Sequence, residues 1–332
     1  MITIAVDAMG GDHGPRVTVP AVIGCLEKYP DLQIHLYGQR AKLDPFLNQV
    51  TATTRLKVFH AEEIVACAER PSAALRKRQS SMRLALDSVR DGKAHGMVSA
   101  GNTGALVTSA RYVLKTLLGI DRPALVARLP NHRGHSYMLD LGANVECDTE
   151  NLLQFAAMGS TLCKVLDGKA KPKVALLNIG SEEIKGNEEI RSANALLKEN
   201  DHLNYIGYIE GDDLYRGTAD VIVCNGFVGN IALKTSEGML QYVAEIIRTG
   251  FKKNLLTRTL GWLALPVLER IKEGFNPDIH NGGVLLGVQG VVVKSHGKSQ
   301  SGPFQNAINT AYLLAKNQLL EKVSEELEAE LH

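Results

Sequence analysis

The sequence predicts an α/β fold built on a largely parallel sheet, and two observations predict it. Short apolar runs alternate with segments of helical period from one end of the 332 residues to the other, which is typical of strands joined by crossover helices. Most of these runs are apolar at consecutive positions, as expected of strands that helices cover on both faces. Because no long linker rich in Pro, Gly or Ser divides the chain, we expect residues 1–332 to form a single domain around one continuous sheet.

The expected strands and helices alternate along the chain. Seven apolar runs are the expected strands: Ile2–Val6, Gln33–Tyr37, Leu56–Phe59, Met97–Ser99, Tyr137–Leu141, Val174–Ile179 and Val221–Cys224. Helices are expected over Ser72–Arg90 and over Glu150–Leu166, the second with Asp148 and Thr149 as caps. A C-terminal helix is expected because apolar residues recur every three or four positions, at Ile308, Tyr312, Ala315, Leu319 and Val323.

Charge and cysteine content exclude several classes of protein. Lys and Arg total 37 against 36 for Asp and Glu, a net charge of +1, so no global basic field is present to bind nucleic acid. The five cysteines form no close CxxC pair, which predicts reduced thiols and neither disulfides nor a zinc site. The N-terminal segment carries Asp7 and no basic residues, so we expect a strand there and not a signal peptide.

The expected strands end in a repeated pattern, in which an apolar run breaks into glycine and small polar residues before a helix. The breaks lie at residues 7–14, 99–104, 140–144, 178–181 and 225–230. In open α/β sheets ligands bind outside the carboxyl ends of the strands, so these loops should converge on one cleft. Glycine lets backbone approach a ligand, and helix N-termini favour anions, so the sequence predicts a phosphate-like ligand. Tight turns alone would account for one or two such loops without a ligand.

Cationic side chains near these loops are candidates to bind the phosphate from several sides. They are Lys185 after the 178–181 turn, Lys234 in the helix after Asn230, and Lys294 with His296 near the C-terminus. For each lysine the alternative is an ordinary solvated surface residue. His13 lies in a glycine-flanked loop, which favours a place in the site over a place in the core.

Familiar nucleotide-binding and nucleophile motifs are missing from the sequence. The glycines of 10–14 and 101–104 lack the spacing of a dinucleotide-binding turn, and those of 290–299 lack the spacing of a P-loop. No HExxH or GxSxG motif occurs, so we expect no metal, no cofactor, and an acyl transfer in which the substrate supplies the nucleophile. Two other classes of protein remain as alternatives. A nicotinamide dehydrogenase would show cofactor absorbance on purification. A non-catalytic phosphate sensor or membrane scaffold would bind phosphate without turnover.

Five tracts together strongly resemble the PlsX family of phosphate acyltransferases. The tracts are residues 6–12, 98–105, 139–144, 177–180 and 294–297, and the match covers nearly the whole chain in order. The resemblance implies reversible acyl transfer from acyl carrier protein to inorganic phosphate. The acyl phosphate formed would pass to a membrane acyltransferase of phospholipid synthesis. The resemblance also implies a homodimer and a three-layer α/β/α sandwich like that of the isocitrate and isopropylmalate dehydrogenases.

This chemistry distributes roles among the loop residues. A phosphate oxygen must attack a thioester carbonyl, so the site has to hold a dianionic nucleophile and stabilise an oxyanion. Phosphate is expected at Ser99, Gly101, Asn102, Thr103 and Gly104 together with Lys185. Oxyanion or thioester contacts are expected from Asn144, Asn225 and Asn230. Asp7, Asp12 and His13 are open alternatives for orienting or deprotonating the phosphate.

Residues 251–272 are expected to form an apolar helical tip with a basic rim. The apolar residues proposed for docking are Leu255, Leu256, Leu260, Trp262, Leu263 and Leu265, and the rim is Lys252, Lys253, Arg258, Arg270 and Lys272. The run is too short to span a bilayer, so we expect peripheral contact with an anionic membrane. A helix pair at a dimer interface fits the pattern equally and is compatible with it. We therefore expect a cytoplasmic protein associated with the inner face of the cell membrane.

Overall fold

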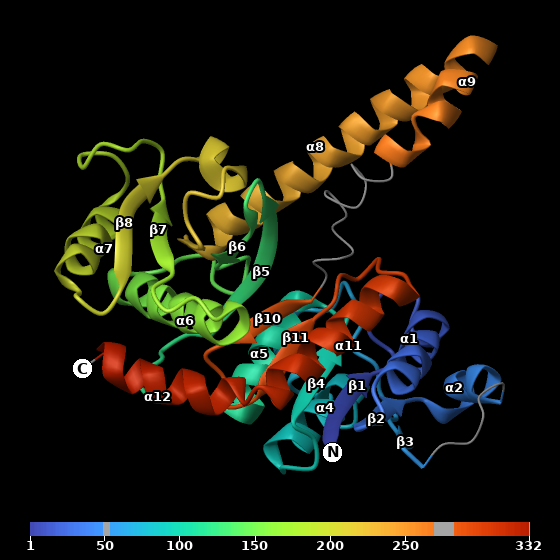
Figure 1. Ribbon diagram of the computed structural model, residues 1–332. Coiled ribbons are helices and arrows are strands. Elements are labelled where there is room, and N and C mark those ends of the chain that lie inside the picture. Colours follow the sequence, from blue (N-terminus) through green and yellow to red (C-terminus); the bar gives the residue numbers. More distant parts are fainter. Residues whose placement is uncertain (49–53, 269–281, 332) are drawn as a thin grey trace.

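Figure 1 shows the computed structural model, which describes residues 1–48, 54–268 and 282–331. Its strands form one continuous sheet, as predicted, in the order β3-β2-β1-β4-β11-β10-β5-β6-β9-β7-β8. Their bounds are β1 (Ile2–Asp7), β2 (Leu32–Gly38), β3 (Leu56–His60), β4 (Gly96–Ser99), β5 (Ala124–Asn131), β6 (Gly134–Leu139), β7 (Lys173–Leu177), β8 (Asn204–Ile209), β9 (Val221–Val223), β10 (Gly283–Leu286) and β11 (Val291–Lys294).

The sheet is largely parallel, and its antiparallel part lies in the middle. β10 runs antiparallel to both β11 and β5, and β5 pairs antiparallel with β6, whereas the other neighbours are parallel. The sequence did not predict β5, β8, β10 and β11. Arg128 and Pro130 interrupt the apolar run of β5, β8 is a half-exposed edge strand, and β10 and β11 are four residues each. β5 and β8 therefore depend on their neighbours for pairing, whereas Val284–Leu286 in β10 and Val291–Val293 in β11 are short apolar runs with a detectable local signal.

Helices cover both faces of the sheet, which confirms the predicted three-layer fold class. Their bounds are α1 (Pro15–Lys28), α2 (Arg40–Leu47), α3 (Pro71–Ala74), α4 (Ser81–Arg90), α5 (Thr103–Leu114), α6 (Thr149–Asp167), α7 (Glu188–Glu199), the 3-10 helix η1 (Gly211–Tyr215), α8 (Gly226–Lys252), α9 (Leu255–Leu263), α11 (Ser301–Lys316) and α12 (Leu319–Leu331). In β1, Ile4 and Val6 pack into the core that contains α1, α6 and α11, whereas Ala5 packs into the core beneath α4 and α5. Alternate residues of one strand are thus buried by opposite helical layers.

Two expected helices are each divided in the structure. The span Ser72–Arg90 forms α3 and α4, because Ser80 pairs with Glu63 and its hydroxyl accepts a hydrogen bond from Arg83 N, which starts a new helix. The C-terminal helix ends at Lys316 and resumes at Leu319, and Gln318 between them has a φ of 54°. The expected cap of α6 is present, since Asp148 accepts from Asn151 N in a capping box.

α8 projects from the body of the molecule, and α9 folds back beside it (Figure 1). The expected tip at 251–272 therefore comprises the end of α8 and α9, while Arg270 and Lys272 lie outside the described residues. The six apolar residues proposed for docking are between 45% and 81% exposed. Among the helices in the described part of the chain, none combines the length and the apolar character needed to cross a bilayer.

Candidate active site

Two of the predicted loops, 7–14 and 99–104, meet the 295–299 loop at the carboxyl ends of β1, β4 and β11. The three strands are parallel neighbours, and Lys294 at the end of β11 is the register partner of Ser99 at the end of β4. Backbone hydrogen bonds join the loops beyond the strands: Ser295 N donates to Ser99 O at 2.9 Å, and Asp12 N donates to Gly297 O at 2.9 Å. The sheet therefore brings the first and last of the sequence motifs together.

Asp7 holds two of these loops in place from beneath. Its buried carboxylate accepts hydrogen bonds from Ser81 Oγ at 2.6 Å, Ser99 Oγ at 2.7 Å and Met9 N at 3.2 Å. Burial raises the pKa of Asp7, against the opposing effect of these donors. Because both carboxylate oxygens already accept from the protein, the structure gives Asp7 a role in positioning the loops.

Asn102 is the N-cap of α5 and also ties down a neighbouring loop. Its Oδ1 accepts from Ala105 N at 2.9 Å, and its Nδ2 donates to the carbonyl oxygens of Cys67 at 2.6 Å and Glu69 at 3.3 Å. Thr103, the first residue of the helix, lines the cavity described below. The glycines beside them serve close packing, because a Cβ at Gly101 or Gly104 would lie 2.6 Å from Met82 and 2.8 Å from Pro71.

The 140–144 loop is held by the buried carboxylate of Asp140. This carboxylate accepts from the backbone N of Leu125, Ala143 and Asn144 and from the Asn144 side chain. Asn144 Nδ2 donates both to Asp140 at 2.9 Å and to Pro123 O at 2.8 Å. Since both amide hydrogens of Asn144 are engaged, its expected contact with an oxyanion is replaced by a structural role.

The other two asparagines lie at the N-terminal end of α8, which packs against this loop. Asn225 is the N-cap and accepts from Val228 N at 2.8 Å, whereas Asn230 is exposed, lines the cavity and lies over Gly142. The helix approaches so closely that a Cβ at Gly229 would lie 2.0 Å from the Asp140 carbonyl oxygen. The close approach brings Asn230 to the cavity.

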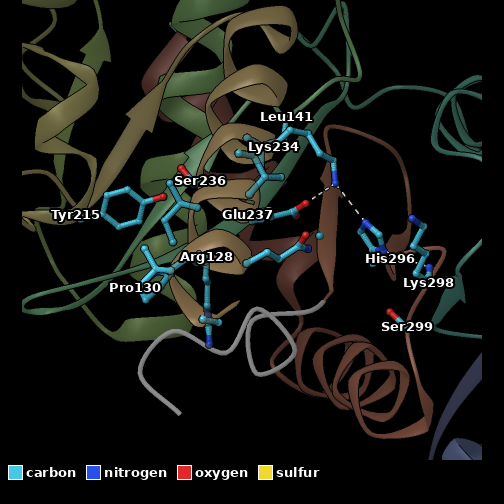
Figure 2. Close-up of a pocket in the computed structure, with 18 of the residues that line it drawn as sticks. Arg128, Pro130, Leu141, Tyr215, Lys234, Ser236, Glu237, His296, Lys298 and Ser299 are labelled. Atoms are coloured by element: carbon cyan, nitrogen blue, oxygen red, sulfur yellow. Dashed lines mark hydrogen bonds and ion pairs between the residues drawn. The ribbon is translucent and has the colours of Figure 1, made fainter. Parts of the chain in front are cut away.

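Lys234 and His296 face each other across the mouth of the cavity, as Figure 2 shows. Lys234 Nζ lies 2.6 Å from Glu237 Oε2 and 3.2 Å from His296 Nε2. Lys298 N donates to His296 Nδ1 at 3.2 Å, which assigns the proton of the neutral ring to Nε2. Burial and the nearby Lys234 lower the pKa of His296, so the ring is neutral at physiological pH. Two donors thus point into one space, which suits an anion.

Lys294 is a mostly enclosed cation in the lining of the same cavity. Its Nζ donates to the carbonyl oxygen of Ser295. Burial lowers the pKa of Lys294 to about 8, with Lys234 as a further lowering charge. Within the described ranges no carboxylate lies within 4 Å of this ammonium group, so an anionic ligand would relieve the cost of its burial.

From these polar groups an apolar groove extends along α8. The cavity has a volume of about 1270 Å³ and is lined by one face of α8, by several residues of β5 and, at its far end, by α9. Its apolar lining includes Leu125, Ala127, Leu129, Leu233, Leu240, Ala244, Ile247, Phe251 and Leu265. The spacing of the α8 residues keeps them on one helix face. Cationic residues lie at both ends of the groove, since Arg248, Lys252 and Arg258 also line it near Phe251, and the lining between the two ends is largely apolar.

Of the residues expected to bind phosphate or act on the thioester, five line the cavity: Thr103, Asn230, Lys234, Lys294 and His296. The other ten lie outside this lining: Asp7, Asp12, His13, Ser99, Gly101, Asn102, Gly104, Asn144, Lys185 and Asn225. Lys185 is in the loop after β7, where its carbonyl accepts from Asn178 Nδ2 at 3.2 Å. Asp12 and His13 are exposed beside the 296–300 loop, with His13 Nε2 3.4 Å from Gln300 Nε2. In the described part of the chain, no three His, Cys, Asp or Glu side chains are arranged to hold a metal ion, and the five cysteines are free thiols.

The sequence did not single out several residues of the lining. Glu237 was detectable, because it stands three positions after Lys234 on the same helix face. Arg128, on an unpredicted strand, and Ser299 had no local signal, although both line the cavity. These residues join the site only through strand pairing and the return of the C-terminal chain.

Comparisons with known proteins identify the family of the chain. A family model described as "Fatty acid synthesis protein" matches residues 2–322. A phosphate acyltransferase from Pseudomonas syringae pv. syringae (strain B728a) is 52% identical over 328 residues, covering 98% of this chain and 96% of the relative. Another, from Shewanella sp. (strain MR-4), is 48% identical over 332 residues, covering 99% of this chain and 97% of the relative.

Among solved structures, a phosphotransacetylase from Streptococcus pyogenes has the same fold. Its TM-score is 0.65 at 17% sequence identity, over 96% of this chain and 94% of that one. The family model spans the five tracts on which the resemblance was based, and the two relatives match nearly end to end. The chain therefore belongs to the fatty acid synthesis protein family, the PlsX family of phosphate acyltransferases that its loop motifs indicate.

Proposed function

We propose that this site transfers an acyl group from acyl carrier protein to inorganic phosphate, by direct attack of bound phosphate on the thioester. The observation that carries the proposal is the continuity of a cationic pocket with a long apolar groove. A phosphate fits the first and an acyl chain fits the second. Their junction, near Thr103, Lys294 and His296, is where the reacting atoms would meet.

The phosphate end supplies charge and donors in place of a nucleophilic side chain. Lys294, Lys234 and neutral His296 would bind the phosphate oxygens, at the N-terminus of α5 that begins with Thr103. A phosphate oxygen then attacks the carbonyl carbon, the new C–O bond forms, and the C–S bond breaks to release the carrier thiolate. Positioning and electrostatic stabilisation account for catalysis of this kind.

Fewer residues than the sequence suggested are available to contact the thioester oxygen or to orient and deprotonate the phosphate. With Asn144 engaged, Asn230 is the asparagine best placed for the thioester oxygen, since it lines the cavity and is exposed. Asp12 and His13 are the remaining candidates for orienting the phosphate from the adjoining loop, because Asp7 is occupied in supporting that loop.

We also propose that the chain works as a homodimer on the inner face of the membrane. The α9 tip exposes Leu256, Trp262 and Leu263 at 71%, 69% and 63%, next to basic residues of the rim. Each leucine moved from water into the lipid interface contributes about 1.5–3 kcal/mol, and each cation near anionic lipid about 1 kcal/mol. Such docking would deliver amphiphilic acyl phosphate directly to the membrane acyltransferase that consumes it.

Phosphate-dependent thiol release tests the reaction. We expect free thiol to appear from palmitoyl acyl carrier protein only when phosphate is present, and hydroxylamine to trap the product as an acyl hydroxamate. A non-catalytic sensor would bind phosphate without releasing thiol. Thiol release that is independent of phosphate, with free fatty acid as product, would instead identify a thioesterase and refute the proposal.

A further inference from the structure

At the far end of the apolar groove, α9 packs on α8. Phe251 lies in the last turn of α8, and Gly261 is the buried residue of α9 that faces it. A Cβ at Gly261 would lie 2.9 Å from the Phe251 ring, so only glycine lets the two helices approach this closely. Both residues line the cavity, and Phe251 is the last apolar residue of α8 in that lining.

The distance along α8 from the phosphate end to this ring matches a long acyl chain. Lys234 and Phe251 are on the same helix and separated by roughly 25 Å, at about 1.5 Å per residue. An extended chain advances about 1.2 Å per bond, so this length accommodates on the order of 20 carbon–carbon bonds. Ala244 lies on the same lining face between them, where a small side chain leaves the passage open.

We propose that Phe251, held against Gly261, ends the acyl groove and sets the longest acyl chain that the enzyme accepts efficiently. This inference rests on the proposed function and adds a residue that determines its specificity. Chains that stop short of Phe251 gain binding with each methylene, by about fourfold in kcat/KM, because each buries more apolar surface. Chains that reach the ring gain nothing further, since the additional carbons must bend out of the groove.

Two substitutions on the groove face should move this limit in opposite directions. Ala244→Phe fills the groove at about 15 Å from Lys234, so kcat/KM should fall steeply for chains longer than about 12 carbons relative to shorter chains. Phe251→Ala opens the end, so a chain of about 22 carbons, which exceeds the wild-type groove, should gain about tenfold relative to one of about 16 carbons. Met239→Phe, which adds the same ring on α8 outside the cavity lining, is the matched control.

The measurement is kcat/KM for a series of acyl carrier proteins loaded with chains of about 8 to 22 carbons, each assayed by phosphate-dependent thiol release. Retained activity of Ala244→Phe on short chains demonstrates that the variant is folded. An unchanged length profile in both groove variants would overturn the proposal while leaving the reaction intact. If the wild type itself released no thiol with any chain, the proposed function would fail instead.

Discussion

Replacing Lys294 separates the stability of the fold from its proposed activity. The Lys294 ammonium is enclosed in the cavity, and burial lowers its pKa from 10.5 to about 8. A charge held at that cost, without a carboxylate within ion-pair distance in the described chain, is expected to serve an anionic ligand. In Lys294→Met the side chain keeps a similar length and loses the charge.

The magnitudes follow from the pKa shift. At about 1.36 kcal/mol per pKa unit, burying the charged form costs at most about 3 kcal/mol, an upper bound because Lys294 is partly exposed. Lys294→Met should therefore raise the free energy of unfolding at pH 7 by up to that amount. Loss of a charge-assisted hydrogen bond to phosphate, about 1.5–3 kcal/mol, should raise the KM for phosphate about 10- to 150-fold.

The sign of the pH dependence is also determined. Because the pKa of Lys294 is lower in the folded state than in the unfolded state, the unfolded chain binds more protons between pH 8 and 10.5. The wild type should gain stability as the pH rises through that window. The difference in free energy of unfolding between the wild type and Lys294→Met should therefore vanish above it. The KM for phosphate should rise above pH 8 in the wild type, whereas Lys294→Arg, which stays charged, should shift that rise to higher pH.

Chemical denaturation and phosphate titrations from pH 6 to 10 are the assays. Lys93→Met, which removes an exposed lysine distant from the cavity lining, is the control and should change neither quantity. A Lys294→Met protein with wild-type phosphate KM, or a wild-type KM that is flat across pH 8, would refute the assignment of the phosphate to this ammonium group.

Further substitutions test the other parts of the site. Asn102→Ala should lower stability by about 1 kcal/mol through loss of the α5 cap and should raise the phosphate KM, whereas Asn102→Asp keeps the cap but loses the hydrogen bonds to the carbonyl oxygens of Cys67 and Glu69, so it should also lower stability. Lys185 lies outside the cavity lining, so Lys185→Met should keep turnover near that of the wild type; a loss of about a hundredfold with an unchanged melting temperature would return this lysine to the site. Leu260→Glu with Leu263→Glu should abolish sedimentation with anionic vesicles; equal sedimentation of a dimeric double variant would exclude the tip as membrane anchor.

Much of the fold could be predicted because its signals are local. The seven expected strands all occur, since each is a largely apolar run, and all but Leu56–Phe59 lead into glycine or a small polar residue within two positions. The predicted and observed strand ends differ by one to three residues. Two strands end where a polar side chain accepts a hydrogen bond from the backbone: Asp140, after β6, accepts from Leu125 N, and Asn178 Oδ1, after β7, accepts from Ile179 N. The pattern of apolar residues does not predict such hydrogen bonds.

The sequence by itself determined the family, the alternation of strands and helices, and which loops end in polar residues, because motifs, period and turn chemistry are short-range properties. Only the tertiary structure decided which of those polar side chains are available. Asp7 and Asn144 are occupied by hydrogen bonds within the protein, whereas Lys294 is brought beside Ser99 and into the cavity by the pairing of β11 with β4. The burial of a side chain and the hydrogen bonds it makes depend on groups distant in sequence. The groove likewise forms between α8 and β5, which meet only in the folded structure.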